Sequence, residues 1–532
     1  MYKFKAQQTI LPHEFFLPFG GKLNPENQWC KLAELIDWGS LESRYAKNFK
    51  DINVGQEALS VRVAAGSLII QNRKNLSDRE TVQEITENPY MQYFIGLEAF
   101  TYKAPFDPSM MVHFRKRLGK DIINETNEMI ANPKQDESDD EPPQDKGTPA
   151  GKTDSIKTDA PDANQGKLIL DATCAPADIH FPTDIWLLNN VREALEEIID
   201  VLHSPHIGSL KKPRTYRNKA RKDFLNISKS KRPNAKKIRK AIGKQLRYIK
   251  RDFSIIKGLA EISPLGLLNK KQYQNLLVAR EIYRQQSEMF LNKKHKVEDR
   301  IVSLHMPFIR PIVRGKTNAP VEFGAKLAIS IVNGYAFMEH LSFDNYNEGT
   351  TLIASVENFK QRFGHYPEAV LADKIYRNRD NIAYCKEHNI RLSGPPLGRP
   401  VKDPELLRQQ YHQEHQDSSL RNAVEGKFGE GKRFYGLNRI MARLQTTTET
   451  VIAMQLLVMN LEKRLRSLFI QIFKVLLKRY FRFIQPNNIW VFAAEVKSIL
   501  VCKFTRLLSK CLNHLHQSVY AAKAVDDEYM AC

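Results

Sequence analysis

The chain has 532 residues, which is too long for one ordinary hydrophobic core, so we expect two to four domains. Its formal net charge of +21 favours a polyanionic partner, with nucleic acid ahead of a membrane surface. Six scattered cysteines without a CxxC pair disfavour a disulfide-rich or zinc-binding protein. No uncharged apolar run reaches the ~18 residues of a membrane span, and no apolar signal segment opens the chain. The cytoplasm fits best.

Residues 1–130 predict a helical domain. Within it, Ser77-Asp78-Arg79-Glu80 has the pattern of a capping box that opens a helix. The domain ends in a basic segment, Phe114-Arg115-Lys116-Arg117-Leu118. Short helices that end in a basic one are typical of a helix-turn-helix that reads DNA, with Arg115 and Arg117 as its candidate contacts. A helical bundle that only packs on the rest of the chain is the alternative.

Residues 131–165 predict a disordered acidic linker. Between residues 131 and 163 there are nine acidic residues against four lysines, together with five prolines. Ile156 is the only large apolar side chain of this stretch. Such a segment cannot bury enough surface to offset the entropy lost on ordering.

The first predicted strand is an apolar run that ends at Asp171, and a large basic helical insertion over residues 178–298 follows it. Between Lys211 and Lys257 the insertion holds 19 lysines and arginines against two aspartates. A charge run is usually a solvated face, but one this dense, interleaved with aromatic residues, predicts a surface that follows DNA phosphates. The candidate contacts are Lys236, Lys237, Arg239 and Lys240.

Strands resume after Arg300, where the apolar runs 301–304 and 308–313 are the first. Asn333-Gly334, between two longer apolar runs, is a strong signal for a two-residue hairpin turn. A predicted helix over residues 350–363 and then a short apolar run that ends at Asp373 come next. Three antiparallel strands, a helix and a parallel strand are the order of an RNase H-like α/β sheet. In that sheet the first and fourth strands are neighbours, which would bring the two aspartates together.

A third acid, Glu425, lies in a polar and basic stretch without proline that predicts a helix. Arg421 lies four residues before it and Lys432 seven residues after it, so both fall near its face of the helix, where they could hold DNA phosphates. The alternative is that they are surface charges that pair with nearby acids. Residues 445–460 predict an amphipathic helix that packs on the core, and residues 461–532 predict a helical basic tail.

Two strand-end carboxylates and one helical carboxylate suit a site for two Mg²⁺ ions, because hard cations take oxygen ligands. We therefore assign Asp171, Asp373 and Glu425 as metal ligands and catalytic residues. Glu430 is a weaker candidate because glycines flank it on both sides, and Asn381 is left out of the set.

The order of these three acids resembles the DDE transposases of bacterial insertion sequences, whose core has an RNase H-like fold. Arg421-x3-Glu425-x6-Lys432 has the spacing of the signature Tyr-x2-Arg-x3-Glu-x6-Lys of one group, although Ser418 stands at the tyrosine position. Further similar segments bring the resemblance to roughly residues 10–460. They are Phe114 to Gly119, Asp171 to Pro176 and Ala372 to Asn381.

The resemblance implies a transposase that binds inverted-repeat ends, cleaves DNA and joins the 3′-ends to target DNA. It implies two Mg²⁺ ions, which Mn²⁺ could replace, with Asp171 bridging both. Double-stranded DNA would be the partner, and a homodimer would form in the synaptic complex, in the prokaryotic cytoplasm at the nucleoid. The core would comprise residues 166–177 and 299–460. A transposase-derived DNA-binding protein without catalysis, and an RNase H-like nuclease without strand transfer, are the alternatives.

Overall fold

The computed structural model describes residues 2, 10–49, 57–132, 164–313, 321–395 and 403–483, with residues 471–483 described by their backbone alone. Met1–Arg464 forms one compact unit and Leu465–Cys532 a second. In the described ranges no helix is both long and apolar enough to span a membrane. The predicted linker, apart from its first and last two residues, and the tail beyond residue 483 lie outside the described residues.

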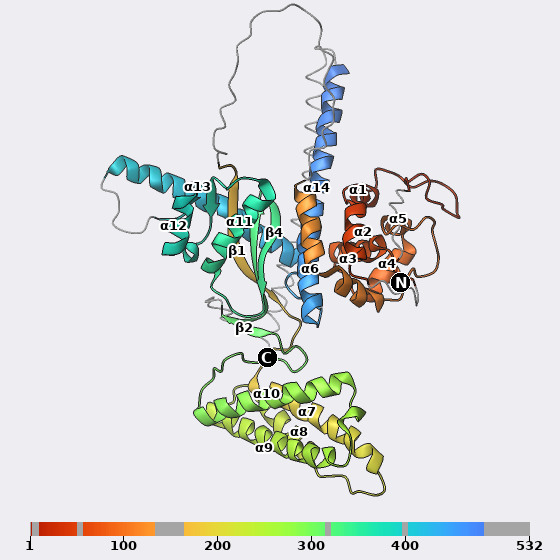
Figure 1. Cartoon of the computed structure of the whole chain (residues 1–532), viewed down its shortest axis with the longest axis vertical. Helices are drawn as coiled ribbons and strands as arrows, with labels where there is room; N and C mark the ends of the chain where they lie inside the picture. Colours follow the sequence, from red (N-terminus) through yellow and green to blue (C-terminus); the bar gives the residue numbers. More distant parts are fainter. Residues whose placement is uncertain are drawn as a thin grey trace, which may run out of the picture. The chain divides into compact units, whose positions relative to one another are not determined.

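Helices make up the N-terminal region (Figure 1). The predicted capping box is confirmed, because Ser77 Oγ accepts the N–H of Glu80 and the Glu80 carboxylate accepts the N–H of Ser77. Gly119, with a φ of 64°, breaks the last helix into two segments, and the basic residues 114–118 lie in the first. The helices are α1 (Gln28–Glu34), α2 (Trp38–Ala46), α3 (Val61–Lys74), α4 (Asp78–Glu87), α5 (Pro89–Phe94) and α6 (Met110–Ala131).

One mixed sheet of six strands carries the core. Strand β1 pairs antiparallel with β3 and parallel with β5, which pairs parallel with β6. On its other edge β3 pairs antiparallel with both β2 and β4. The predicted mixed α/β sheet of RNase H-like order is confirmed. The strands are β1 (Lys167–Pro176), β2 (Arg310–Val313), β3 (Val321–Val332), β4 (Tyr335–Ser342), β5 (Ala369–Leu371) and β6 (Arg391–Leu392).

The predicted hairpin joins β3 to β4. Asn333 and Gly334 have φ values of 50° and 78°, the two positive angles that a type I′ turn requires. The prediction of a strand at residues 301–304 is wrong. Ile301 and Leu304 pack into the core of the insertion, so that core includes residues beyond 298.

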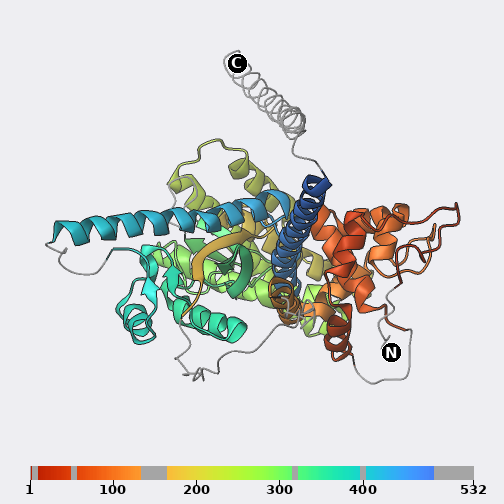
Figure 2. The same ribbon diagram turned by 90° about the horizontal axis from the view of Figure 1, so that it is seen from above.

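Helices cover both faces of the sheet. Leu168, Leu170 and Val370 pack with α11 (Leu352–Phe363) in one apolar cluster. Because side chains alternate along a strand, Ile169 and Asp171 point to the opposite face. There α13 (Pro404–Phe434), the long cyan-blue helix at the left of Figure 2, contacts β1, β3 and β5. The remaining elements of this region are η3 (Glu348–Thr351), η4 (Lys374–Tyr376), α12 (Arg379–Glu387) and α14 (Gln445–Phe483).

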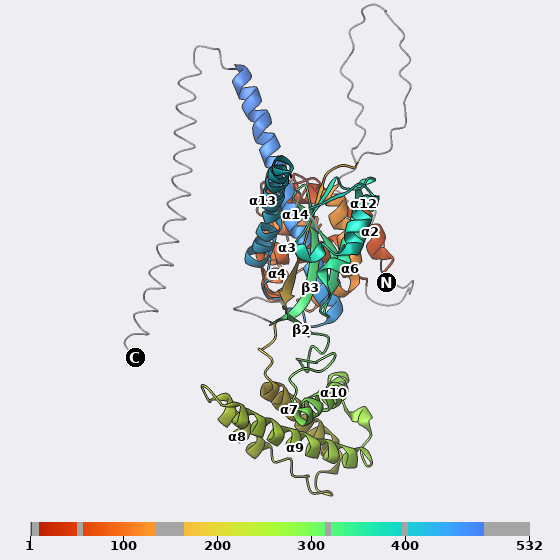
Figure 3. The same ribbon diagram turned by 90° about the vertical axis from the view of Figure 1, so that its left-hand side faces the viewer.

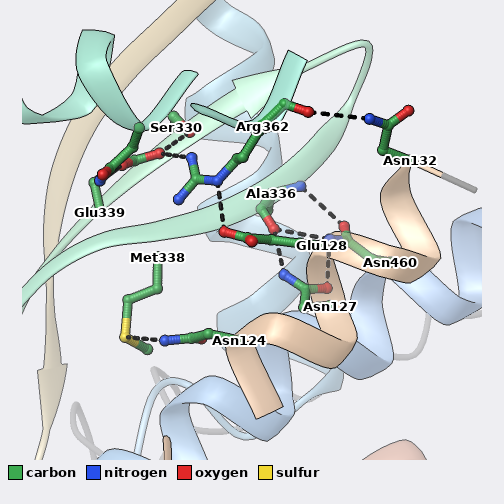
Figure 4. Close-up of polar contacts among 11 residues, drawn as sticks. Asn124, Asn127, Glu128, Asn132, Ser330, Ala336, Met338, Glu339, Arg362 and Asn460 are labelled. Atoms are coloured by element: carbon green, nitrogen blue, oxygen red, sulfur yellow. Dashed lines mark hydrogen bonds and ion pairs between the residues drawn. The ribbon is translucent and has the colours of Figure 1, made fainter. Parts of the chain in front are cut away.

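Helix α6 is attached to the outer side of β4 by a buried amide network (Figure 4). Asn127 and Asn460 both donate to the carbonyl of Ala336, and Asn460 Nδ2 also donates to Asn127 Oδ1 at 2.8 Å. Nearby, Arg362 of α11 pairs with Glu128 of α6. Leaving one of these buried amides unsatisfied would cost about 1–3 kcal/mol. The end of the N-terminal region is therefore fixed to the sheet.

The insertion contains helices that share a core of their own and lie side by side in Figure 3. Leu195, Ile249 and Ile282 are fully buried in it. Ion pairs between residues of the insertion neutralise part of its positive charge, as between the partly exposed Arg217 and Asp200. The helices are α7 (Asp184–His203), α8 (Arg217–Ser228), α9 (Ala235–Ala260) and α10 (Lys270–Asn292).

Candidate active site

The strand register brings the two aspartates together. Ile169 pairs with Leu371 in parallel, and the same register continued by two residues sets Asp171 opposite Asp373. Asp171 lies inside β1 and not at its end, which corrects the sequence prediction. The reason is that β1 stays paired with β3 as far as Pro176, whereas β5 stops at Leu371. Asp171 therefore faces the space that opens where its parallel neighbour ends.

A cleft of about 910 Å³ occupies this space. Asp171, Asp373, Glu425 and Lys432 all line it, so four predicted site residues from three separate elements share one cleft. Glu430, the weaker candidate, does not line it and pairs with Lys427 at 2.9 Å. Other lining residues that bear on the chemistry are Lys326, Tyr346 and Glu348.

Asp171 is an acid of the cleft whose pKa is strongly raised. Burial raises its pKa to about 6, and the negative charges of Glu348 and Asp373 act in the same direction. The backbone N–H of Ala172 and the guanidinium of Arg421 oppose this shift. Carboxylates crowded in a partly desolvated site repel one another, and a bound cation relieves that repulsion.

Asp373 has a cation beside it. It caps η4, where its Oδ1 accepts the N–H of Lys374, and the same oxygen lies 2.9 Å from Nη1 of Arg421. Burial works against ionisation, but these two contacts together hold the pKa of Asp373 below its ordinary value. Arg421 thus pairs with one of the candidate metal ligands, the alternative that the sequence left open.

Helix α13 positions Glu425. Val424 and Lys427 are buried on either side of it, which anchors this part of the helix on the sheet while Glu425 itself is exposed to the cleft. Two turns earlier in α13, the carboxylate of Asp417 accepts hydrogen bonds from Nη1 and Nη2 of Arg391 in β6. The helix is therefore held against the same strands that carry the aspartates.

Sequence reasoning missed Glu348. It opens η3, lines the cleft and pairs with Lys326 at 3.0 Å. The sequence predicted a helix from residue 350 onward, so Glu348 fell in the preceding loop, where an acid is usually a cap. Asn381, which the sequence set aside, is buried and donates to the carbonyls of Gly349 and Tyr376.

The donor set of the cleft fits a hard divalent cation, because its acids supply the oxygen ligands that Mg²⁺ prefers. Across the part of the chain that the structure describes, no three acidic, histidine or cysteine side chains stand close enough together to hold one ion in this conformation. The Arg421–Asp373 pair commits one carboxylate oxygen of Asp373 to a guanidinium.

The predicted DNA contacts lie in different environments. Arg115 is buried and bonds Asp78 and Gln71, and Arg117 stacks on Phe49, so both side chains have partners inside the N-terminal region. In the insertion, all four candidates on α9 are exposed. One of them, Arg239, donates to the carbonyl of Phe290 and stacks on its ring. The exposed lysines are Lys236, Lys237 and Lys240.

Comparison with known proteins gives two family matches in this chain. Residues 370–462 match the model described as the transposase DDE domain, and residues 18–117 match the transposase domain DUF772. The uncharacterized protein ORF8 in the nfe locus of Rhizobium meliloti is 34% identical over 103 residues, which are 19% of this chain. This chain spans 49% of that relative. No solved structure matches. The first match covers both Asp373 and Glu425, and the two matched regions are the domains of an insertion-sequence type of DDE transposase.

Proposed function

We propose that this protein binds the inverted-repeat ends of an insertion sequence, cleaves the DNA there and joins the freed 3′-ends to target DNA. The observation that carries the proposal is the shared cleft of Asp171, Asp373 and Glu425. Three carboxylates from a central strand, the end of its parallel neighbour and a crossing helix supply ligands from three directions. That arrangement suits two divalent cations and an incoming phosphodiester.

Asp171, Asp373 and Glu425 would hold two Mg²⁺ ions, which Mn²⁺ can replace. Such ions supply Lewis-acid activation of a water or 3′-hydroxyl and stabilisation of the leaving oxygen. The backbone sets the geometry: Asp171 and Asp373 come from neighbouring parallel strands, and α13 brings Glu425 over the sheet. Lys432, which lines the same cleft, would hold a phosphate of the transposon end.

Arg421 has two successive partners in this proposal. Without DNA it pairs with Asp373. A DNA phosphate can accept two parallel hydrogen bonds from the guanidinium, and this bidentate pair would free the aspartate to bind the metal. End binding and metal binding would then favour one another.

The exposed cations of α9 would supply affinity for the DNA backbone without regard to sequence. Lys236 and Lys237 lie in the first turn of a 26-residue helix, where the dipole disfavours positive charge, so they do little for the helix itself. The same helix end attracts anions. Base reading would fall to the N-terminal helices. Because Arg115 is buried in its pair with Asp78, a direct DNA contact by Arg115 would need that pair to open.

A cleavage assay on the inverted repeats that flank the gene tests the proposal. The protein should cut at the ends and join them to a second duplex with Mg²⁺ or Mn²⁺, as a homodimer on paired ends. Asp171→Asn should abolish both steps and keep end binding, since it removes a charge but little volume. Binding without cleavage by the parent chain would favour a DNA-binding derivative. Cleavage without joining would favour a nuclease.

A further inference from the structure

Glu348 lines the same cleft as Asp171, Asp373 and Glu425. It opens η3, in the connection between β4 and α11, and its carboxylate pairs with Nζ of Lys326 at 3.0 Å. Lys326 is a nearly buried residue of β3 that pairs in register with Cys174 of β1. The charge of Glu348 acts on Asp171 more strongly than that of Asp373 does, so Glu348 is electrostatically part of the centre.

Several contacts fix the backbone on either side of Glu348. Asn347 caps η3, and its Oδ1 accepts the N–H of Gly349 at 3.0 Å. Gly349 approaches η4 so closely that a Cβ there would lie 2.6 Å from the carbonyl oxygen of Ile375. Asn381 donates to the carbonyls of Gly349 and Tyr376, at 2.7 and 2.8 Å. Glu348 is thereby held beside the turn that Asp373 caps.

The cleft also contains polar groups that suit a charged ligand. Tyr346 lines it, and its hydroxyl is buried without a hydrogen-bond partner among the described residues. Lys326 donates to the Tyr346 carbonyl at 2.7 Å, so the ammonium is fixed near the acids. In the absence of a metal, Lys326 and Arg421 therefore neutralise Glu348 and Asp373 from two sides.

We propose that Glu348 is a fourth carboxylate of the cation centre, which exchanges Lys326 for a divalent cation shared with Asp171. The inference rests on the proposed function, because it names a further ligand of the same site. A cation there would gain an oxygen ligand that is already positioned, at the cost of one ion pair. The alternative is that the Lys326–Glu348 pair only holds the η3 connection in place.

The two roles predict different signs. If Glu348 is a ligand, Glu348→Gln should weaken metal binding, and Lys326→Gln should strengthen it because a competing cation is gone. If the pair only holds the η3 connection in place, both substitutions should lower the stability, and Glu348→Gln should change the Mn²⁺ affinity by well under tenfold, because its charge then acts on the ion only from a distance. Mn²⁺ is the probe, and free Mn²⁺ in titrations of the full chain without DNA is measured by electron paramagnetic resonance.

We expect Glu348→Gln to weaken Mn²⁺ binding at least about tenfold, a loss typical of a disturbed metal shell. Lys326→Gln should tighten it, and Asp344→Asn, four residues upstream and exposed, should leave it unchanged. Circular dichroism reports folding, and Glu348→Asp replaces the glutamine variant if that one unfolds. Being shorter by one methylene, it should weaken binding less than loss of the carboxylate would.

Two outcomes separate this inference from the proposed function. If Asp171→Asn weakens Mn²⁺ binding but neither Glu348 variant does, the fourth carboxylate is overturned and the three-acid centre stands. If Asp171→Asn also leaves the affinity unchanged, the cation centre itself is wrong. A tighter Mn²⁺ complex in Glu348→Gln would likewise overturn the inference, because the loss of a ligand cannot tighten binding.

Discussion

The cleft and the insertion carry their charge in opposite ways. In the cleft, acids and cations are paired at fixed positions, as Asp373 is with Arg421 and Glu348 with Lys326. In the insertion, acids such as Asp223 pair internally, while lysines on α9 project outward. Charge at fixed positions can align reacting atoms, whereas exposed charge only attracts a polyanion. Substitutions should therefore act almost all-or-none in the cleft and by degrees on the insertion.

The largest effect should come from the helical acid of the cleft. Glu425→Gln removes a charged ligand with little change of volume, so the end-cleavage rate should fall by about a thousandfold or more. Glu430→Gln is the matched control on the same helix, since Glu430 pairs with Lys427 and lies outside the cleft. Cleavage rates on a flanking-repeat duplex measure both. Near-normal cleavage by Glu425→Gln would remove this residue from the catalytic set.

The affinity of the insertion for DNA should fall gradually as its exposed lysines are replaced. Lys236, Lys237 and Lys240, changed together to glutamine, should reduce the slope of log affinity against log salt by up to about three units, one for each lost phosphate contact. Specific and random duplexes should weaken alike. Arg284→Gln is the control, because this exposed arginine of α10 is already paired with Glu281 and Glu288. An unchanged slope, or a loss confined to the specific ends, would mean that α9 is not a general phosphate surface.

These contrasts also mark what the sequence could predict. Local sequence patterns were sufficient where residues close together in the sequence determine the structure, as at the Ser77 capping box and the Asn333-Gly334 turn. Asp171 and Asp373 each follow the paired residues Ile169 and Leu371 by two positions. Their proximity was therefore predictable once the order of the strands was correct. Glu348 was not, because its role depends on the approach of Gly349 to η4, a contact between segments that no local pattern encodes.

Charged residues were the harder class to predict. The basic segment around Arg115 has the composition of a DNA contact, yet Arg115 is buried against Asp78, a residue that the sequence marks only as part of a cap. Arg239 belongs to a dense cationic run but stacks on Phe290 of another helix. Composition identifies a cationic stretch, whereas tertiary packing decides which of its members already have partners inside the protein.

A smaller effect should follow from Arg421→Ala. The substitution removes a phosphate contact from the proposed complex, so assembly on paired ends should weaken about tenfold or more. Arg408→Ala, an exposed arginine earlier in the same helix, should leave assembly unchanged. Native gels of the protein with end duplexes measure the assembly. Normal pairing of ends by Arg421→Ala would support a surface ion pair with Asp373 as its whole role.

The last prediction concerns stability and tests whether the interior of the insertion is as well paired as the cleft. Asp252 of α9 is fully buried, and neither carboxylate oxygen has a hydrogen-bond partner among the described residues. Burial raises its pKa to about 8, helped by the charge of Glu196 and opposed by nearby arginines. Those arginines are Arg192, Arg217 and Arg251.

The carboxyl of Asp252 is neutral in the folded chain at pH 6 and ionised in the unfolded one, so folding takes up a proton. Stability from this group is complete below the ordinary pKa and is lost as pH rises towards about 8. The free energy of unfolding of Asp252→Asn, relative to that of the parent chain, should therefore increase by roughly 1.4 kcal/mol per pH unit between pH 6 and 8. Asp223→Asn is the control, because pairing with Lys244 and Tyr248 outweighs burial and lowers the pKa of Asp223. Its effect should be the same at pH 6 and 8.5. Calorimetric unfolding of the full-length variants measures both, and a pH-independent difference for Asp252→Asn would show that this carboxyl does not titrate in the folded chain.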